Sequence, residues 1–310
     1  MLGPLCGGLF LGWALGANDA ANVFGTAVAA RIVPYRKACV LCGLAVILGA
    51  YMQGQAGIDT LSGLTDQTVS TLIITTVAAA ITVTLMTIFK LPVSTSQAIV
   101  GAITGIGLAT GDMNWTGLEK VLICWVSTPL GAMLIACVVY KILDVFITRV
   151  PMSMLTRDKI LWSGLLVMGT YGSYALGANN VANATGIFVN KIPLLTSCDL
   201  ALLGGVAIAA GTFSSKRVML TVGTGIMRLD AFTALVAVTA MSVTVHIFAV
   251  VGVPVSTSQG IVGAIMGIGM MRGVRAVRFR SLGNIAVGWL LTPAVSLILA
   301  AAGYAIFAKT

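Results

Sequence analysis

Two runs of glycine, asparagine and aspartate interrupt apolar stretches of the chain. Residues 15–28 read LGANDAANVFGTAV and residues 176–189 read LGANNVANATGIFV, which agree at eight of fourteen positions. Asp19 is the one acidic residue within an apolar stretch, where an ionised group is costly and marks a functional site by default. Amide and carboxylate oxygens are suitable ligands for Na⁺, and a carboxylate can also act as a proton carrier. We therefore predict a coupling-cation site formed by Asn18, Asp19, Asn22, Asn179, Asn180 and Asn183, with Asp19, Asn18 and Asn179 as Na⁺ ligands.

Both runs are also expected to interrupt their helices. Glycine and asparagine favour a local break, which would expose backbone carbonyls and N–H groups inside the protein. An unwound helix that offers carbonyls to a cation is a device of membrane transporters. In the alternative interpretation, the amides only join neighbouring helices by hydrogen bonds.

A second pair of motifs reads LPVSTSQAIVGAITGIGL over residues 91–108 and VPVSTSQGIVGAIMGIGM over residues 253–270, with fourteen of eighteen positions identical. Proline followed by Ser-Thr-Ser predicts a helix that begins inside the protein. The free N–H groups and partial positive charge of such a helix end attract an anion. The alternative is that the hydroxyls only cap their helices. We predict an anion site formed by Ser94, Thr95, Ser96, Gln97, Ser256, Thr257, Ser258 and Gln259.

The two pairs of motifs occur in the same order in both halves of the chain, which indicates a tandem duplication. We place the halves at residues 1–150 and 151–310. Each half contains about five apolar stretches, and an odd number of crossings would turn the second half upside down relative to the first. Such inverted repeats are typical of transporters, with the substrate near the midplane of the membrane. The stretches cover residues 2–29, 38–54, 68–89, 92–110 and 118–140, then 160–189, 199–214, 231–251, 254–271 and 282–307.

The loop charges support this inversion. In the first half the basic residues follow the first stretch, whereas in the second half they follow the second and the fourth. The positive-inside rule places these loops, and a linker over residues 141–159, in the cytoplasm, so that both termini face outward. The basic residues concerned are Arg31, Arg36 and Lys37, then Lys216, Arg217 and Arg228, and finally Arg272, Arg275, Arg278 and Arg280.

The composition excludes an ordinary soluble protein. Of the 310 residues, 58% are hydrophobic and only 9% are charged, whereas about a quarter of the residues in soluble domains are charged. The 36 glycines and the small aromatic content predict closely packed helices and not a β-barrel with aromatic girdles. We therefore expect an all-α polytopic protein of the cytoplasmic membrane, in contact with the lipid bilayer. The net charge of +9 reflects loop orientation, and we expect no nucleic-acid partner.

The remaining reactive side chains favour structural roles. Cys39 and Cys42 form a CxxC pair without the four ligands of a structural zinc site, so we expect them to pack. His246 has no acidic neighbour in the sequence, which favours a hydrogen-bonded packing residue over a proton carrier. The chain lacks HExxH, GxSxG and a second acid within the membrane. We therefore expect neither an enzyme nor a resident cofactor.

Taken together, the four motifs resemble those of the PiT family of inorganic phosphate transporters, and the resemblance covers nearly the whole chain. It implies a symporter that moves inorganic phosphate together with Na⁺ or H⁺ by alternating access. It also implies that the Asn and Asp motifs lie near the cation and the Ser and Thr motifs near the anion. The chain departs from the family pattern at Asn180, where aspartate is expected, and at Gln97 and Gln259, where histidine is frequent.

Sulfate is the alternative substrate, because sulfate permeases of the same superfamily carry similar Ser-Thr-Ser motifs. Phosphate near neutral pH still has a proton to donate, whereas sulfate has none. A nearby Asp19 would favour phosphate by accepting that proton and would repel sulfate. A passive anion channel is a further alternative, which broken inverted repeats disfavour. A homodimer is among the assemblies expected for such a chain.

Overall fold

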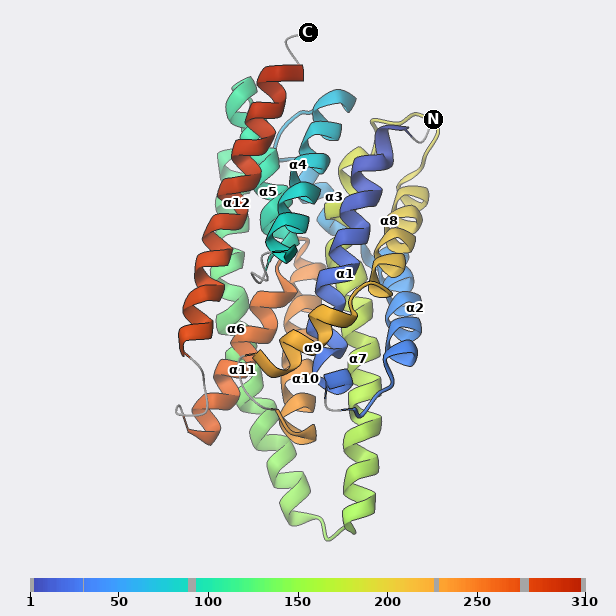
Figure 1. Cartoon of the computed structure of the whole chain (residues 1–310), viewed down its shortest axis with the longest axis vertical. Coiled ribbons are helices and arrows are strands. Elements are labelled where there is room, and N and C mark those ends of the chain that lie inside the picture. The colour runs from blue at the N-terminus through green and yellow to red at the C-terminus, as the bar shows by residue number, and fades with distance from the viewer. Residues whose placement is uncertain (1–2, 30, 89–92, 226–228, 274–278, 308–310) are drawn as a thin grey trace.

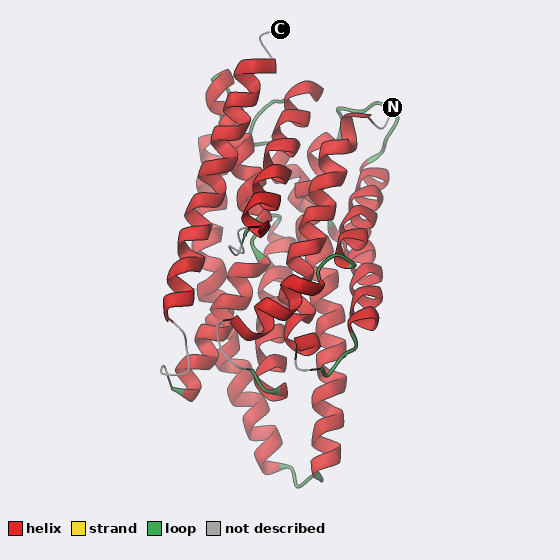
Figure 2. Ribbon diagram, viewed as in Figure 1, coloured by secondary structure: helices red, strands yellow, loops and turns green. Residues whose placement is uncertain are grey.

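The computed structural model describes residues 3–29, 31–88, 93–225, 229–273 and 279–307. Within these ranges every regular element is a helix, as Figure 2 shows. The expected all-α fold is therefore confirmed. Pro92 of the first Ser-Thr-Ser motif and three of the basic loop residues, Arg228, Arg275 and Arg278, lie outside the described residues.

Within the described residues, the two halves contain matching series of α-helices. The first half has α1 (Cys6–Ala29), α2 (Tyr35–Gln53), α3 (Gln55–Ser62), α4 (Val69–Ile88), α5 (Thr95–Thr110) and α6 (Trp115–Arg149). The second half has α7 (Met154–Ala184), α8 (Ser197–Thr212), α9 (Lys216–Gly225), α10 (Ala231–Val251), α11 (Thr257–Arg272) and α12 (Phe279–Phe307). Two short 3-10 helices, η1 (Gly3–Leu5) and η2 (Gly186–Phe188), precede α1 and follow α7. The ten apolar stretches correspond to ten of these helices, and α3 and α9 are short helices within the connections.

The two halves have opposite orientations in Figure 1. α1 runs downward from the end of the molecule at which α12 terminates, whereas α7 runs upward from the turn at residues 150–153. α4 and α5 lie in the upper half of the view, and α10 and α11 lie in the lower half. The predicted inverted repeats are therefore confirmed.

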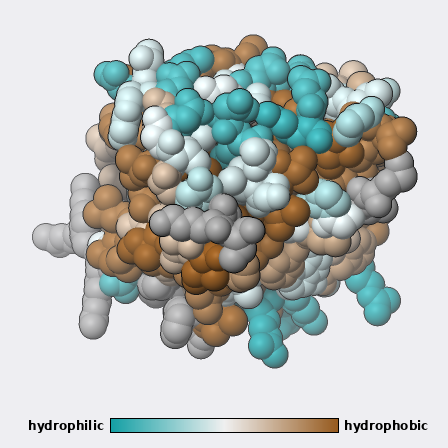
Figure 3. Space-filling model, turned by 90° about the horizontal axis from the view of Figure 1, so that it is seen from above, coloured by the Kyte–Doolittle hydropathy of each residue, from teal (hydrophilic) through white to brown (hydrophobic). Residues whose placement is uncertain are grey.

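The outer surface of the bundle is suited to lipid. Among the described residues, five helices are long and apolar enough to cross a membrane by length and composition, namely α2, α4, α6, α10 and the part of α12 from Leu282 to Phe307. The long helix α6 exposes a row of apolar side chains that includes Val126, Leu130 and Leu134. Figure 3 looks onto the end of the molecule at which α12 terminates, where hydrophilic residues gather, with hydrophobic residues around the sides. The chain is a multi-pass membrane protein.

Both Ser-Thr-Ser motifs start a helix inside the protein, as predicted. α5 begins directly after Ser94 and α11 directly after Ser256, and the backbone of both serines is extended. Each serine hydroxyl accepts a hydrogen bond from the backbone N–H three residues later, at Gln97 and Gln259, with a distance of 3.3 Å in both cases. In the second half Gly252 ends α10 with a φ of 81°, which side-chain-bearing residues rarely adopt. The chain therefore turns back within the bundle at this position.

The expected interruption is absent from the first glycine and asparagine run, whereas the second run contains the end of α7 at Ala184, which the 3-10 helix η2 follows. α1 is continuous through residues 16–22 and α7 through residues 177–183. Their glycines serve close packing instead. A Cβ at Gly16 would overlap the carbonyl oxygen of Ile208 in α8, and a Cβ at Gly177 would overlap that of Val46 in α2. Through residues 16–22 and 177–183, side chains and not unwound carbonyls therefore supply the polar groups.

The connection between the halves is shorter than expected. α6 and α7 extend through most of the predicted linker at 141–159 and leave only residues 150–153 as a turn. Figure 1 shows this helical hairpin projecting beyond the other helices at the lower end. The linker is therefore mainly helical and not an open loop.

The helix pairs α4–α5 and α10–α11 each pack on the long helix of the other half of the chain. α5 packs against α12, and α11 packs against α6. Glycine permits the close approach, since a Cβ at Gly101 would overlap the backbone of Pro293 and a Cβ at Gly263 would overlap that of Pro129. Each of these two helices is thereby fixed against the long helix of the other half.

Candidate functional site

The candidate residues of all four motifs are buried, and none is more than 8% exposed. α1 and α7 carry the asparagine motifs, and α5 and α11 begin with the Ser-Thr-Ser motifs. Because α5 and α11 enter from opposite ends of the molecule, their N-termini meet in its interior (Figure 1). Hydrogen bonds between side chains and backbone then join the four helices into one polar cluster.

The two Ser-Thr-Ser motifs bind each other symmetrically. The hydroxyl of Ser96 donates to the carbonyl oxygen of Val255 over 3.0 Å, and the hydroxyl of Ser258 donates to that of Val93 over 3.2 Å. Ser96 and Ser258 hold equivalent positions in the two halves, as do Val93 and Val255. The bonds bring the N-terminal turns of α5 and α11 together, so that the partial positive charges of both helix ends act on one region.

The first asparagine of each motif bonds to the valine that precedes the capping serine of a helix. Asn179 donates to the carbonyl oxygen of Val255 over 2.7 Å and accepts from its N–H over 3.1 Å. Its equivalent, Asn18, donates to the carbonyl oxygen of Val93 over 3.4 Å. These amides therefore hold backbone in place. This agrees in part with the alternative interpretation, in which the amides only join neighbouring helices by hydrogen bonds.

Asp19 is buried among neutral partners. One of its carboxylate oxygens accepts from the side-chain amide of Asn18 over 3.0 Å, and the other accepts from the hydroxyl of Thr95 over 2.9 Å. In the described part of the chain, the two ion pairs join Lys191 to Asp66 and Arg272 to Asp230, and neither includes Asp19. A buried carboxylate is costly without an opposite charge. The charge of Asp19 must therefore be neutralised by a bound cation or by a proton, since none of the described ion pairs includes it.

The counterpart of this acid in α7 is neutral. Asn180 accepts with its Oδ1 from the hydroxyl of Ser96 over 3.2 Å and from the amide of Asn183 over 2.8 Å. Asn183 also donates to the hydroxyl of Ser96, and Asn22 of α1 donates to the hydroxyl of Thr257. The later asparagines thus connect each half to the helix start of the other half.

Four buried polar atoms in the cluster have no hydrogen-bond partner in the structure. They are Oε1 of Gln97, Oε1 of Gln259, Nδ2 of Asn180 and Oδ1 of Asn183. A buried polar atom costs free energy when it makes no hydrogen bond. These atoms therefore indicate a place where a polar ligand would be stabilised.

The structure brings the predicted cation and anion residues into one network and does not separate them. Thr95, assigned to the anion from the sequence, bonds directly to Asp19, assigned to the cation. Val93 and Val255 are not among the residues predicted from the sequence, although their carbonyl oxygens each accept hydrogen bonds from two of the candidate side chains. Their one signal in the sequence is the valine that precedes the first serine in both copies of the motif.

The lone histidine has the expected bonded packing environment. His246 of α10 bonds through Nδ1 to the hydroxyl of Tyr171 and through Nε2 to the side chain of Gln53, 2.7 Å away. Its ring also packs edge-on against Tyr171 and Tyr174 of α7. Both ring nitrogens therefore have a hydrogen-bond partner. Cys39 and Cys42 are buried free thiols.

Comparisons with known proteins point to one family. The model of the phosphate transporter family matches the chain twice, over residues 15–163 and 153–300. A protein described as a phosphate permease of Methanocaldococcus jannaschii is 30% identical over 291 residues, which cover 94% of this chain and 92% of that protein. A sulfate permease of Bacillus subtilis is also 30% identical, over 296 residues that cover 93% of this chain and 83% of the permease.

A solved structure has the same fold. It is described as the sodium-dependent phosphate transporter, shares 26% of its residues with this chain, and superposes with a TM-score of 0.87. The match covers 99% of this chain and 98% of that structure. The two matches of the family model together span both halves and all four motifs. This chain therefore belongs to the phosphate transporter family, whose members are transporters and not enzymes.

Proposed function

We propose that this protein is a symporter that moves inorganic phosphate together with Na⁺ across the cytoplasmic membrane by alternating access. One observation carries the proposal: Asp19, a buried carboxylate without a cationic partner, bonds to the first turn of α5, which meets the first turn of α11. The carboxylate needs a cation, and the paired helix ends favour an anion. Because each buried charge is costly alone, the two ligands stabilise each other when both are bound.

The proposed anion site combines helix ends with neutral donors. The first turns of α5 and α11 offer N–H groups, and Nδ2 of Asn180 is an unpartnered donor. The carboxamides of Gln97 and Gln259 can each turn to present either a donor or an acceptor. A site without lysine or arginine can also release its anion, as transport requires. The residues proposed for phosphate are Ser94, Thr95, Ser96, Gln97, Ser256, Thr257, Ser258 and Gln259.

The proposed cation site centres on Asp19. The hydroxyl oxygen of Thr95 and the unpartnered Oδ1 of Asn183 are further hard ligands in the same cluster. Such oxygens suit Na⁺, and the similarity to a solved sodium-dependent phosphate transporter favours Na⁺ over H⁺. With neutral Asn180 at the second acidic position, the site neutralises one cationic charge. The remaining members of the proposed set are Asn18, Asn22 and Asn179, the last through the second lone pair of its carbonyl oxygen.

The inverted architecture supports alternating access over a passive channel. The α4–α5 and α10–α11 pairs enter from opposite ends and meet at their tips, so movement of one half against the other would open either end in turn. We propose residues 1–150 and 151–310 as the two units of this movement. From the basic loops we propose that both termini face away from the cytoplasm. A homodimer stays a prediction, which the mass of the purified protein in lipid nanodiscs would test.

Sulfate is the second candidate substrate because of the similarity to the Bacillus subtilis sulfate permease. Hydrogen phosphate carries a P–OH group that can donate to Oε1 of Gln97 or Gln259, both of which are buried and unpartnered. Sulfate carries acceptors only, so it can bond to these carboxamides only when they present N–H groups, whereas hydrogen phosphate can bond to either side of them. This difference favours phosphate.

Competition for uptake tests the substrate. In liposomes containing the purified protein, we expect unlabelled phosphate and arsenate to suppress uptake of radiolabelled phosphate at concentrations at least about tenfold lower than sulfate or molybdate. The same series in choline instead of Na⁺, at two pH values, identifies the coupling ion. Equal suppression by sulfate would argue for a general oxyanion permease. Uptake that depends neither on Na⁺ nor on pH would reject symport, and large continuous currents would indicate a channel.

A further inference from the structure

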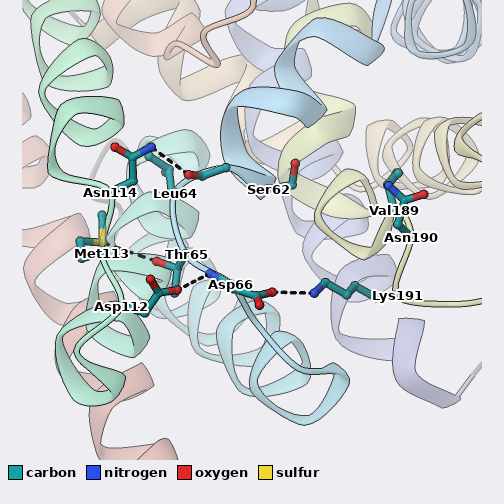
Figure 4. A pocket seen from close by; sticks show the side chains of 11 residues that line it. Ser62, Leu64, Thr65, Asp66, Asp112, Met113, Asn114, Val189, Asn190 and Lys191 are labelled. Atoms are coloured by element: carbon teal, nitrogen blue, oxygen red, sulfur yellow. Dashed lines mark hydrogen bonds and ion pairs between the residues drawn. The ribbon is translucent and has the colours of Figure 1, made fainter.

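A hollow of about 560 Å³ opens at the end of the molecule where α12 terminates. Three connections surround it: the one between α3 and α4, the one between α5 and α6, and the one after η2 (Figure 4). The first two belong to the first half of the chain and the third belongs to the second half. The hollow therefore lies at a boundary between the two inverted halves.

An ion pair crosses this hollow. Nζ of Lys191 lies 2.8 Å from Oδ1 of Asp66, and the backbone N–H of Asp66 donates to Oδ2 of Asp112 over 2.7 Å. Figure 4 shows Asp66 between Asp112 on one side and Lys191 on the other. The neighbouring ammonium of Lys191 lowers the pKa of the Asp66 carboxyl below its ordinary value. Lys191 is the one basic residue among those that line the hollow.

Hydrogen bonds join the two first-half connections of the hollow to each other more extensively than to the second-half connection. On the first-half side, Asn114 donates from its backbone to the carbonyl oxygen of Leu64 over 2.9 Å and from its side chain to that of Gly63 over 3.0 Å. Among the described residues that line the hollow, the bond from Lys191 to Asp66 is the one polar bond that joins the two halves. If the halves separate here, this ion pair is the bond that must break.

A second, smaller cavity continues inward from the hollow. It has a volume of about 20 Å³, room for about one water molecule, and shares Ser62, Thr65 and Lys191 with the hollow. Its inner walls include the apolar side chains of Leu72, Ile103 and Ile187. Ile103 lies on α5, eight residues after Thr95, which corresponds to about 12 Å along the helix. The inner cavity therefore lies beside the helix whose first turn belongs to the polar cluster.

We propose that the ion pair between Asp66 and Lys191 is the gate of the anion pathway at this end of the molecule. Lys191 lines both cavities and its partner Asp66 lines the outer one, so the pair stands where the two cavities meet. An arriving oxyanion can replace the carboxylate of Asp66 as the partner of the Lys191 ammonium, which releases the connection between the halves and admits the anion. The inference rests on the proposed transport function, and it adds Lys191 and Asp66 to the residues that act in the transport cycle.

Chemical labelling beneath the gate tests this without a transport assay. Gln67 lines the inner cavity and is 5% exposed, so a cysteine in its place reports opening. In lipid nanodiscs, we measure the rate at which a polar maleimide labels the Gln67→Cys variant, with mass spectrometry to separate this site from the native thiols. The exposed Cys198 supplies the internal reference. Because the Asp66 side chain is 86% exposed and the pair is correspondingly weak, we expect Lys191→Gln or Asp66→Asn to speed labelling about three- to fivefold.

Two further variants make the result specific. Lys120→Gln removes an exposed lysine near the start of α6 and should leave the rate unchanged. Exchange of the charges, with Asp66→Lys and Lys191→Asp in one protein, should restore slow labelling. Equal rates in all variants, or equal acceleration by Lys120→Gln, would overturn the gate. Labelling reports opening and not uptake, so the two proposals can fail separately. If the protein showed these labelling rates but did not transport phosphate, the proposed function would be refuted and the opening controlled by the ion pair would stand.

Discussion

The Asp19→Asn variant is expected to fold and to lose nearly all Na⁺-driven phosphate uptake. The replacement keeps the shape of the side chain and an oxygen that can accept from Thr95, but it removes the one buried charge of the cluster. Removal of one partner of a buried charge pair costs about 2–5 kcal/mol, which corresponds to a loss of about 30-fold or more. The measurement is the initial rate of labelled phosphate uptake into liposomes under an inward Na⁺ gradient. Size-exclusion chromatography of the same preparation reports folding.

Asp144→Asn is the matched control for this experiment. Asp144 is exposed on α6, outside the polar cluster, so its loss should leave uptake close to that of the unmodified protein. If Asp19→Asn retained full Na⁺-driven uptake, Asp19 would not neutralise the coupling cation. If it failed to fold, a shift in the Na⁺ concentration for half-maximal uptake in Asp19→Glu would still test the assignment.

Simultaneous replacement of Ser96 and Ser258 by alanine has the second-largest expected effect. The two hydroxyls make the symmetric bonds that hold the starts of α5 and α11 together, and both are buried. A hydrogen bond of this kind contributes about 1 kcal/mol net, so loss of both should raise the KM for phosphate by about 30-fold. Each single variant should lie between the double variant and the unmodified protein. The measurement is the phosphate dependence of uptake at saturating Na⁺.

The control replaces two hydroxyls that bond only within their own helix. Ser127 and Thr148 of α6 each donate to the carbonyl oxygen four residues earlier and lie outside the cluster. Ser127→Ala with Thr148→Ala should therefore leave the KM unchanged. If the Ser96 and Ser258 double variant also kept its KM at normal expression, the meeting of the two helix ends would not determine phosphate affinity.

The helix starts could be predicted from the sequence because a cap is a local device. Ser94 and Ser256 bond to an N–H only three residues away, and the proline and serine pattern that encodes this arrangement is short. The inversion could also be predicted, since repeat order and loop charge are properties of the sequence itself. In these respects the structure follows the sequence closely.

The continuity of α1 and α7 could not be predicted in the same way. Gly16 looked like a helix breaker, but its role depends on the backbone of Ile208, far away in the sequence. The bond between Thr95 and Asp19 likewise depends on how α5 docks beside α1. From local propensity we predicted a break in both helices and separate sets of cation and anion residues. Tertiary packing instead keeps the helices continuous through residues 16–22 and 177–183 and joins the two sets in one network. The Asp66 and Lys191 pair is a third case, because it joins loops from opposite halves.

We propose that one buried cluster binds Na⁺ and phosphate together and that the protein moves both across the membrane. The most direct measurement is the accumulation of labelled phosphate inside liposomes that carry an inward Na⁺ gradient at equal pH on both sides. We expect accumulation above the external concentration, which disappears when choline replaces Na⁺ or when an ionophore collapses the Na⁺ gradient. Equal accumulation in choline, or equilibration to the external concentration under a full Na⁺ gradient, would contradict it.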